Sequence, residues 1–264
     1  MAGALAKRSE DARVPALAMA KGFKGYGPIE QQPVRKIEIV EDKTLRQLRE
    51  SWKAFRYAGG APKKEYDNAL SLLKGFEYSA ADVEKFSIAL AEFEVEGRSG
   101  CKAGFFLSAL MNSSNDTEFI IHTTQLAEPP YYLGCRNTKN ITVKGNAGGG
   151  AGYRMQGGTI TVEGDADIAV GDSMEDGAII VRGNAGYWLG PGMQGGSIVV
   201  EGNAGPELGK WMKDGSITVV GDAGDFIGIL MQGGEIYLEG NYGRIADGFE
   251  HGKIFHKGVL IFER

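Results

Sequence analysis

The chain has few of the residues that cross-link a fold, and no segment that would cross a membrane. Only two of its 264 residues are cysteines, Cys101 and Cys135, and they form no CxxC pair. Two cysteines are too few for a disulfide framework or a thiolate metal centre, which favours a reducing compartment. No run of about 18 apolar residues occurs, and Lys7, Arg8 and Arg13 interrupt the N-terminal apolar residues, unlike a secretory leader. We therefore expect a soluble cytoplasmic protein.

The sequence also lacks the motifs that carry most catalytic chemistry. It contains no GxSxG nucleophile elbow and no GxxxxGK[ST] phosphate loop, and its three histidines are His122, His251 and His256. His251 and His256 stand close to Asp247 and Glu250, so a shared metal site is one interpretation. Zinc and iron sites need three or four converging ligands, and a place on the surface or between subunits explains these histidines more simply. We predict no catalytic, cofactor-binding or metal-binding residues.

Glycine is abundant, and in the C-terminal half it belongs to a regular repeat. A similar phrase (ITVKGNA, ITVEGDA, IIVRGNA, IVVEGNA, ITVVGDA, IYLEGNY) opens every 19 residues and runs on to a methionine and glycine. Within each phrase apolar residues alternate, which indicates a strand, and the recurring glycines indicate tight corners. The repeat therefore predicts a single-stranded right-handed parallel β-helix with 19-residue coils stacked about 4.8 Å apart.

Stacked coils of this kind place like residues above one another in the interior. The repeat predicts an isoleucine ladder, a valine ladder, an alanine ladder and a methionine ladder that ends at Phe249. An Asn/Asp row after the first glycine of each coil suits a corner where side chains cap turn backbone. The ladders begin at Ile141, Val143, Ala147 and Met155, and the Asn/Asp row begins at Asn146.

Two features of the repeat have other interpretations. The run GPGMQG at residues 190–195 matches GxGxxG, but a dinucleotide site requires a strand before it and a helix after it. The same glycines recur as corners, which disfavours nucleotide binding. Calcium-binding β-rolls repeat about every nine residues with a fixed Asp. A period of 19 residues with mostly neutral Asn disfavours calcium, and the even spacing of the methionines favours packing over copper.

Composition divides the chain near residue 140. Of 41 glycines, 30 lie from residue 141 onward, where 9 Lys/Arg stand against 16 Asp/Glu, a net charge of −7. The preceding part has a net charge of +2. A solenoid this acidic is a poor candidate for nucleic acid, and nothing in the pattern indicates a membrane surface. The expected partners are therefore other proteins.

Apolar spacing divides the chain into an arm and two domains. We predict a flexible arm over residues 1–32, an α-rich domain over 33–116 and the β-helix over 117–264. The α-rich domain, together with the strand 119–124 and residues 128–136, would cover the first coil of the solenoid. At the other end, residues 255–262 would form a final strand, whose apolar character indicates that something covers it. Within the α-rich domain we predict a strand over 34–41 and helices over 44–57, 62–76, 79–90 and 102–111.

The phrase IxVxGNAG followed by xxxGxxMxGG, in tandem, resembles a known family. It is similar to the GXGXG-type β-helix that forms a subunit of formylmethanofuran dehydrogenase and of the related formyltransferase/hydrolase complex, and the C-terminal domain of the glutamate synthase large chain. The best-matching stretches are residues 179–196 (IIVRGNAGYWLGPGMQGG) and 198–224. The resemblance spans about residues 133–253 and leaves the helical residues 33–115 outside it.

The resemblance implies a non-catalytic scaffold that positions catalytic partners and binds no cofactor itself. We expect a subunit of an oxidoreductase or formyltransferase complex, of the formylmethanofuran dehydrogenase/formyltransferase type in one-carbon metabolism. Its partners would carry molybdopterin or tungstopterin, iron–sulfur clusters or FMN. Three alternatives stay open: the β-helix subunit of a glutamate-synthase-like complex, a free-standing protein-binding module, and an enzyme with its site between the helices and the solenoid.

Overall fold

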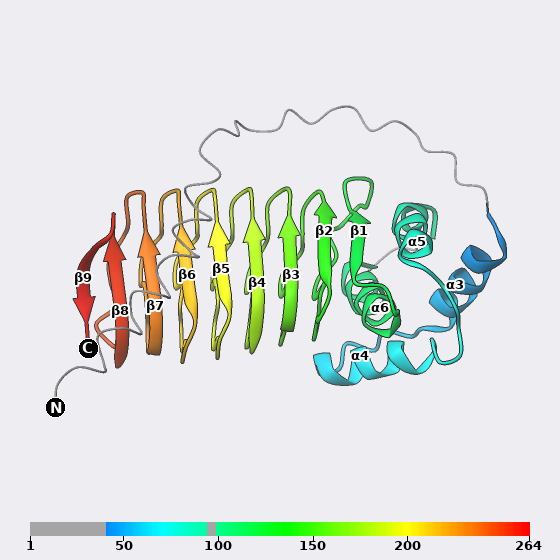
Figure 1. Cartoon of the computed structure of the whole chain (residues 1–264), viewed down its shortest axis with the longest axis horizontal. Helices are drawn as coiled ribbons and strands as arrows, with labels where there is room; N and C mark the ends of the chain where they lie inside the picture. Colours follow the sequence, from blue (N-terminus) through cyan, green and yellow to red (C-terminus); the bar gives the residue numbers. More distant parts are fainter. Residues whose placement is uncertain (1–40, 94–98) are drawn as a thin grey trace.

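A computed structural model describes residues 41–93 and 99–264, so the predicted arm and most of the strand predicted over 34–41 lie outside it. Nine strands form one sheet in sequence order, β1 to β9, of which β1 to β8 are parallel (Figure 1). The chain winds as the predicted parallel β-helix. The strands are β1 Glu118–His122, β2 Asn140–Lys144, β3 Gln156–Val162, β4 Asp176–Val181, β5 Ser197–Val200, β6 Ser216–Val219, β7 Gln232–Leu238, β8 His251–His256 and β9 Val259–Glu263.

The 19-residue period sets the register of the sheet. Ile141 pairs with Ile160 and Val143 with Val162, and the same offset continues through β7. Because every coil repeats the geometry of the last, equivalent side chains meet the same surroundings and form continuous ladders. The predicted ladders are confirmed: the isoleucines, valines, alanines and methionines are all buried, as is Phe249 at the end of the methionine row.

The Asn/Asp row binds each coil to the next. Asn146 Oδ1 accepts a hydrogen bond from the backbone N–H of Asp165 at 2.9 Å, and Asp165 Oδ1 accepts one from Asn184 at 2.7 Å. The pattern continues at 2.8–2.9 Å to Asn241. The predicted capping role is confirmed, with the difference that each side chain caps the backbone of the following coil. These oxygens already accept N–H groups, which further disfavours calcium there.

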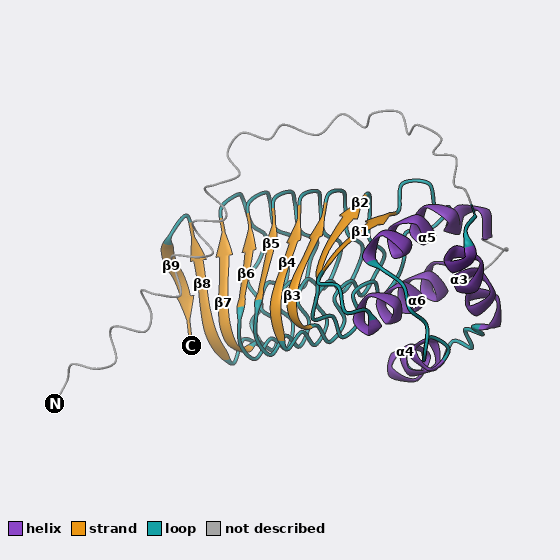
Figure 2. Ribbon diagram, turned by 45° about the vertical axis from the view of Figure 1, so that its right-hand side comes forward, coloured by secondary structure: helices purple, strands orange, loops and turns teal. Residues whose placement is uncertain are grey.

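Four helices cover the β1 end and form what we call the helical cap (Figures 1 and 2). Asp42 caps α3 by accepting from the Leu45 N–H at 2.8 Å, and Pro62 stands in the first turn of α4, where its missing N–H costs nothing. Trp52 packs edge-on against Phe106 at 5.5 Å inside the cap. The helices are α3 Lys43–Ala54, α4 Pro62–Ser71, α5 Ala80–Phe93 and α6 Ser99–Ser113.

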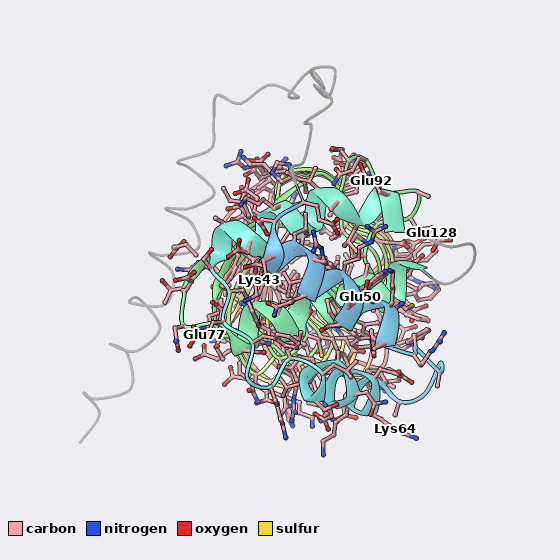
Figure 3. All side chains as sticks on the ribbon, turned by 90° about the vertical axis from the view of Figure 1, so that its right-hand side faces the viewer. Lys43, Glu50, Lys64, Glu77, Glu92 and Glu128 are labelled. Atoms are coloured by element: carbon pink, nitrogen blue, oxygen red, sulfur yellow. The ribbon has the colours of Figure 1, made fainter. Side chains whose placement is uncertain are left out.

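The outer side of the helical cap is polar, which suits a surface in contact with solvent. Charged side chains of both signs are exposed there, as the view onto this end shows (Figure 3): Lys43, Glu50, Lys64, Glu77, Glu92 and Glu128. The inner side meets β1, where the His122 N–H donates to Ser87 Oγ at 3.0 Å. His122 Nε2 also lies 3.0 Å from Glu84 Oε1 on α5. His122 thus connects the helical cap to the sheet.

The segment 128–136, predicted to cover the first coil, is instead part of it. The Tyr132 N–H donates to the Gly149 carbonyl at 2.8 Å, and the Gly152 N–H donates to the Leu133 carbonyl at 2.9 Å. These bonds repeat the pattern between later coils, and β1 pairs with β2 in the same parallel register. The solenoid therefore begins at β1, one coil before the recognisable repeat, and among the described residues the helices cover its end (Figure 1).

The C-terminal end is a hairpin, where a single strand over 255–262 was predicted. β8 and β9 pair antiparallel across Lys257 and Gly258, whose φ angles are +51° and +78°. A two-residue turn with two left-handed residues matches the twist of a hairpin, so the chain reverses here. β9 is the last strand of the sheet, and Val259 is 64% exposed.

One corner offers a matched test of the left-handed backbone. Gly158 has a φ of +71°, and a Cβ there would lie 2.2 Å from the Lys139 carbonyl oxygen, whereas a Cβ on Gly157 meets nothing within 4 Å. We expect Gly158→Ala to lower the free energy of unfolding by about 1–3 kcal/mol. Gly157→Ala should change it by less than about 1 kcal/mol. Urea denaturation measures both, and equal midpoints would contradict a conformational requirement at residue 158.

Candidate interaction surface

The two C-terminal histidines do not share a site. His251 begins β8 and His256 ends it, so about five residues of extended strand, roughly 17 Å, separate them. His256 Nε2 lies 3.0 Å from the Gly240 carbonyl, and the ring packs edge-on to Tyr242 at 4.9 Å. Within residues 41–93 and 99–264 no three His, Cys, Asp or Glu side chains converge as a metal site would require.

The other candidate residues from the sequence also have structural roles. The GPGMQG run at 190–195 is the corner between β4 and β5, so a strand follows it where nucleotide binding needs a helix. Met155 and the four methionines stacked beyond it are fully buried. Burial also raises the pKa of the Cys135 thiol to about 12, which keeps it protonated and unreactive.

The boundary between helical cap and solenoid is packed closely along α6. Ser108 Oγ accepts hydrogen bonds from the backbone N–H groups of Gly134 at 2.9 Å and Cys135 at 3.2 Å. Asn112 Nδ2 donates to the Cys135 carbonyl at 3.0 Å, and a Cβ on Gly104 would lie 1.7 Å from the Tyr131 carbonyl oxygen. Contacts this close pack α6 directly against the first coil.

One corner of the solenoid instead exposes large apolar side chains. Backbone hydrogen bonds between successive coils stack this corner, for example from the Trp188 N–H to the Pro206 carbonyl at 3.1 Å. Trp188 is 40% exposed and Trp211 is 48% exposed, and they are two of the three tryptophans in the chain. We call the group the aromatic corner: Ile168, Tyr187, Trp188, Trp211, Phe226 and Leu230.

The backbone of the aromatic corner is left-handed at several bulky residues. Trp188, Trp211 and Phe226 have φ angles of +59°, +57° and +62°. A left-handed residue with a side chain costs roughly 1 kcal/mol or more, and Gly150 and Gly192 fill equivalent places in other coils. Each of the three bulky residues keeps 40–48% of its surface in solvent, so packing within the fold uses only part of each ring.

Lys210 connects the two indoles of the aromatic corner. Its Nζ lies 4.6 Å from the centre of the Trp211 ring, 5.4 Å from that of Trp188, and 2.6 Å from Glu207 Oε2. The hydrogen bond from Lys210 lowers the pKa of the Glu207 carboxyl, and a hydrogen bond from Trp188 adds to that effect. These contacts fix side chains that would otherwise rotate freely, so binding a partner costs less side-chain entropy.

The aromatic corner was not predicted from the sequence, although a signal for it exists. Within the repeat, Trp188 and Trp211 stand at two corner positions that vary from copy to copy. The other copies have Gly150, Ala169, Glu207 and Phe226 at the first position and Arg154, Ser173, Gly192 and Leu230 at the second. Aligning the copies by their 19-residue period therefore separates these variable corner positions, with their bulky residues, from the constant positions of the ladders. Departures at solvent-facing corners point to function, since they contribute nothing to the ladders.

No family model matches the chain, and no curated protein does. A solved structure that it resembles is the formyltransferase/hydrolase complex of Methylorubrum extorquens in complex with methylofuran, with 28% identity and a TM-score of 0.46. The match covers 55% of this chain and 58% of that chain. No helix among residues 41–93 and 99–264 has the length and apolar character that a membrane span requires.

Proposed function

We propose that the chain is a non-catalytic scaffold subunit of a multi-subunit enzyme complex and that the aromatic corner docks a protein partner. The observation that carries the proposal is the pair of indoles, Trp188 and Trp211, held in solvent at left-handed backbone positions and joined through Lys210. Tryptophan, tyrosine and arginine dominate the binding energy of protein interfaces.

The rigidity of the solenoid supports this role. The ladders and the Asn/Asp row fix the backbone of each corner by bonds to both neighbouring coils, as the Ala169 N–H to Tyr187 carbonyl bond at 2.9 Å illustrates. A surface that is ordered before binding loses little conformational entropy when it binds. Around Phe226, Arg244 lies 4.4 Å from the ring centre and gives the corner a polar margin.

For the identity of the complex, we propose the formylmethanofuran dehydrogenase/formyltransferase type in one-carbon metabolism. The repeated phrase, best seen at residues 179–196, supports it, because several positions of the motif recur together. Under this proposal the chain binds no cofactor, and its partners carry the molybdopterin or tungstopterin and the iron–sulfur clusters. A partner with FMN and a glutaminase would instead place the chain in a glutamate-synthase-like complex.

Capture of partners from the native cells tests the docking surface. We expect the tagged wild-type chain to retain a defined set of subunits and the Trp188→Ala/Trp211→Ala double variant to lose them. Each hot-spot residue contributes about 2 kcal/mol or more, which is about 30-fold in affinity. Loss of both should therefore lower the affinity by more than about 30-fold, and by about 1,000-fold if the two effects add. Tyr242→Ala is the control, since Tyr242 is a 38% exposed aromatic residue outside the corner.

The outcomes separate the two parts of the proposal. Undiminished capture by the double variant would mean that partners dock elsewhere, while the scaffold role would stand. A wild-type chain that stays monomeric without partners in native extracts would contradict the scaffold role itself. Mass spectrometry of the captured subunits then distinguishes molybdopterin or amidohydrolase proteins from an FMN protein with a glutaminase.

A further inference from the structure

The sheet ends at β9 in an edge that no described strand covers. β9 pairs with β8 along one side, and its other side carries backbone N–H and C=O groups that point away from β8. This edge lies at the opposite end of the solenoid from the helical cap (Figure 1). Val259 is 64% exposed there and Leu260 is 43% exposed. An open edge with exposed apolar residues is a typical place for another strand to add.

β9 is held firmly in place by contacts within its own chain. The Phe262 ring packs edge-on against Phe249, the last side chain of the methionine row, with the ring centres 4.8 Å apart. Arg264 exchanges backbone hydrogen bonds with Gly252 at 3.1 and 3.2 Å, and its Nη1 donates to the Phe249 carbonyl at 2.8 Å. Because the edge is already ordered, pairing with another strand costs it little conformational entropy.

The two ends of the sheet differ in what they can pair with. At the β1 end the helical cap covers the edge, and the His122 N–H of β1 already donates to Ser87 Oγ of α5 at 3.0 Å. The β9 edge of one copy therefore cannot pair with the β1 edge of the next, which blocks a head-to-tail filament. Copies of the chain can still join β9 to β9 about a two-fold axis, an arrangement that closes at two copies.

We propose that β9 pairs antiparallel with β9 of a second copy, so that two solenoids join tail to tail as a symmetric dimer. Parallel pairing would set Lys257 beside Lys257 and Glu263 beside Glu263, which is repulsive. Antiparallel pairing centred on Leu260 sets Lys257 of each copy opposite Glu263 of the other, since both stand three positions from Leu260. The same register sets Val259 opposite Ile261 and Leu260 opposite its own counterpart.

The charges on either side of Leu260 select this register over its neighbours. Lys257 and Glu263 are both exposed. The Glu263 carboxylate lies 3.6 Å from Lys253 Nζ of its own copy and its side chain keeps 53% exposure, so it can accept from a second cation. A shift of one residue would set Lys257 opposite Arg264 or Phe262 and lose both ion pairs. Charged residues at an edge also discourage pairing with unrelated strands.

Two charge reversals that complement each other only between different copies test the dimer. In sedimentation velocity of the purified full-length chain, we expect the wild type to reach twice its mass of 28.3 kDa. Lys257→Glu alone opposes two carboxylates at both symmetry-related sites, and Glu263→Lys alone opposes two amines. Each should raise the dissociation constant of the dimer by at least about tenfold. An equimolar mixture of the two variants has an attractive pair at both sites and should form the dimer again.

The mixture also controls for folding, because a variant that had lost its structure could not restore the dimer. Lys213→Glu is the matched control: Lys213 is an exposed lysine between β5 and β6, away from β9, and its reversal should leave the dimer unchanged. A wild-type chain that stays monomeric would overturn the proposal, as would a mixture that stays monomeric. Neither result affects the docking role of the aromatic corner, which is measured by capture of partners.

Disulfide trapping measures the register directly. Leu260→Cys places two thiols beside the two-fold axis, where the Cβ atoms of opposed residues lie about 4.5–5.5 Å apart, so mild oxidation should link the copies. Val259→Cys is the control, since Val259 faces Ile261 and its own counterpart lies diagonally, about 7–8 Å away. The wild-type chain controls for the native thiols of Cys101 and Cys135. Equal linkage through both positions, or none through Leu260, would overturn the register.

Discussion

Val181→Asp should abolish the folded β-helix. Val181 is fully buried, and its neighbours in the ladder are Val162 and Val200 on the adjacent strands. A carboxylate there has no polar partner, and an unpaired buried charge costs several kcal/mol even after relaxation. Because a domain of this kind is stable by only about 5–15 kcal/mol, that loss removes most of the free energy of unfolding. Thermal melting followed by circular dichroism should show no cooperative transition, or the protein should aggregate.

Thr161→Asp is the matched control for this prediction. Thr161 lies on β3 next to Val162, but its side chain points to the opposite face of the sheet and is partly exposed. A carboxylate there remains hydrated, so we expect a change within about 1 kcal/mol. If Val181→Asp instead melted like the wild-type chain, the assignment of interior and exterior faces along the strands would be wrong.

Periodicity made the coils predictable because each one meets two copies of itself. Ile160 packs between Ile141 and Ile179, so the same side chain is favoured at every turn and the register can be read from the sequence. The first coil could not be predicted from the period in this way. One of its sides meets α6 and not another coil, so residues such as Leu133 are selected for packing against the helix. The repeat phrase is therefore absent from the first coil.

The candidate surfaces were less predictable than the fold. Trp188 and Trp211 become neighbours only when two coils are stacked and Lys210 is placed between them. Exposure at corners and on outer faces depends on what else packs there, which the repeat does not specify.

The contact between α6 and the first coil should be the most sensitive point of the helical cap. Glycine within a helix usually costs about 1 kcal/mol relative to alanine, so Gly104→Ala would ordinarily stabilise α6. Here the added Cβ would lie 1.7 Å from the Tyr131 carbonyl oxygen and 2.7 Å from its carbon, which are backbone atoms that cannot rotate away. The helix must therefore move outward, which weakens the bonds from Gly134 to Ser108.

We expect Gly104→Ala to lower the free energy of unfolding by about 3 kcal/mol or more, at the upper end for overpacked sites. Gly100→Ala is a graded control one turn earlier in α6, since its Cβ would lie 3.0 Å from the Pro129 carbonyl oxygen and should cost less. Urea denaturation followed by tryptophan fluorescence measures both, because Trp52 reports on the cap while Trp188 and Trp211 report on the coils. If Gly104→Ala proved as stable as Gly100→Ala, α6 would not lie against the first coil as closely as the backbone geometry requires.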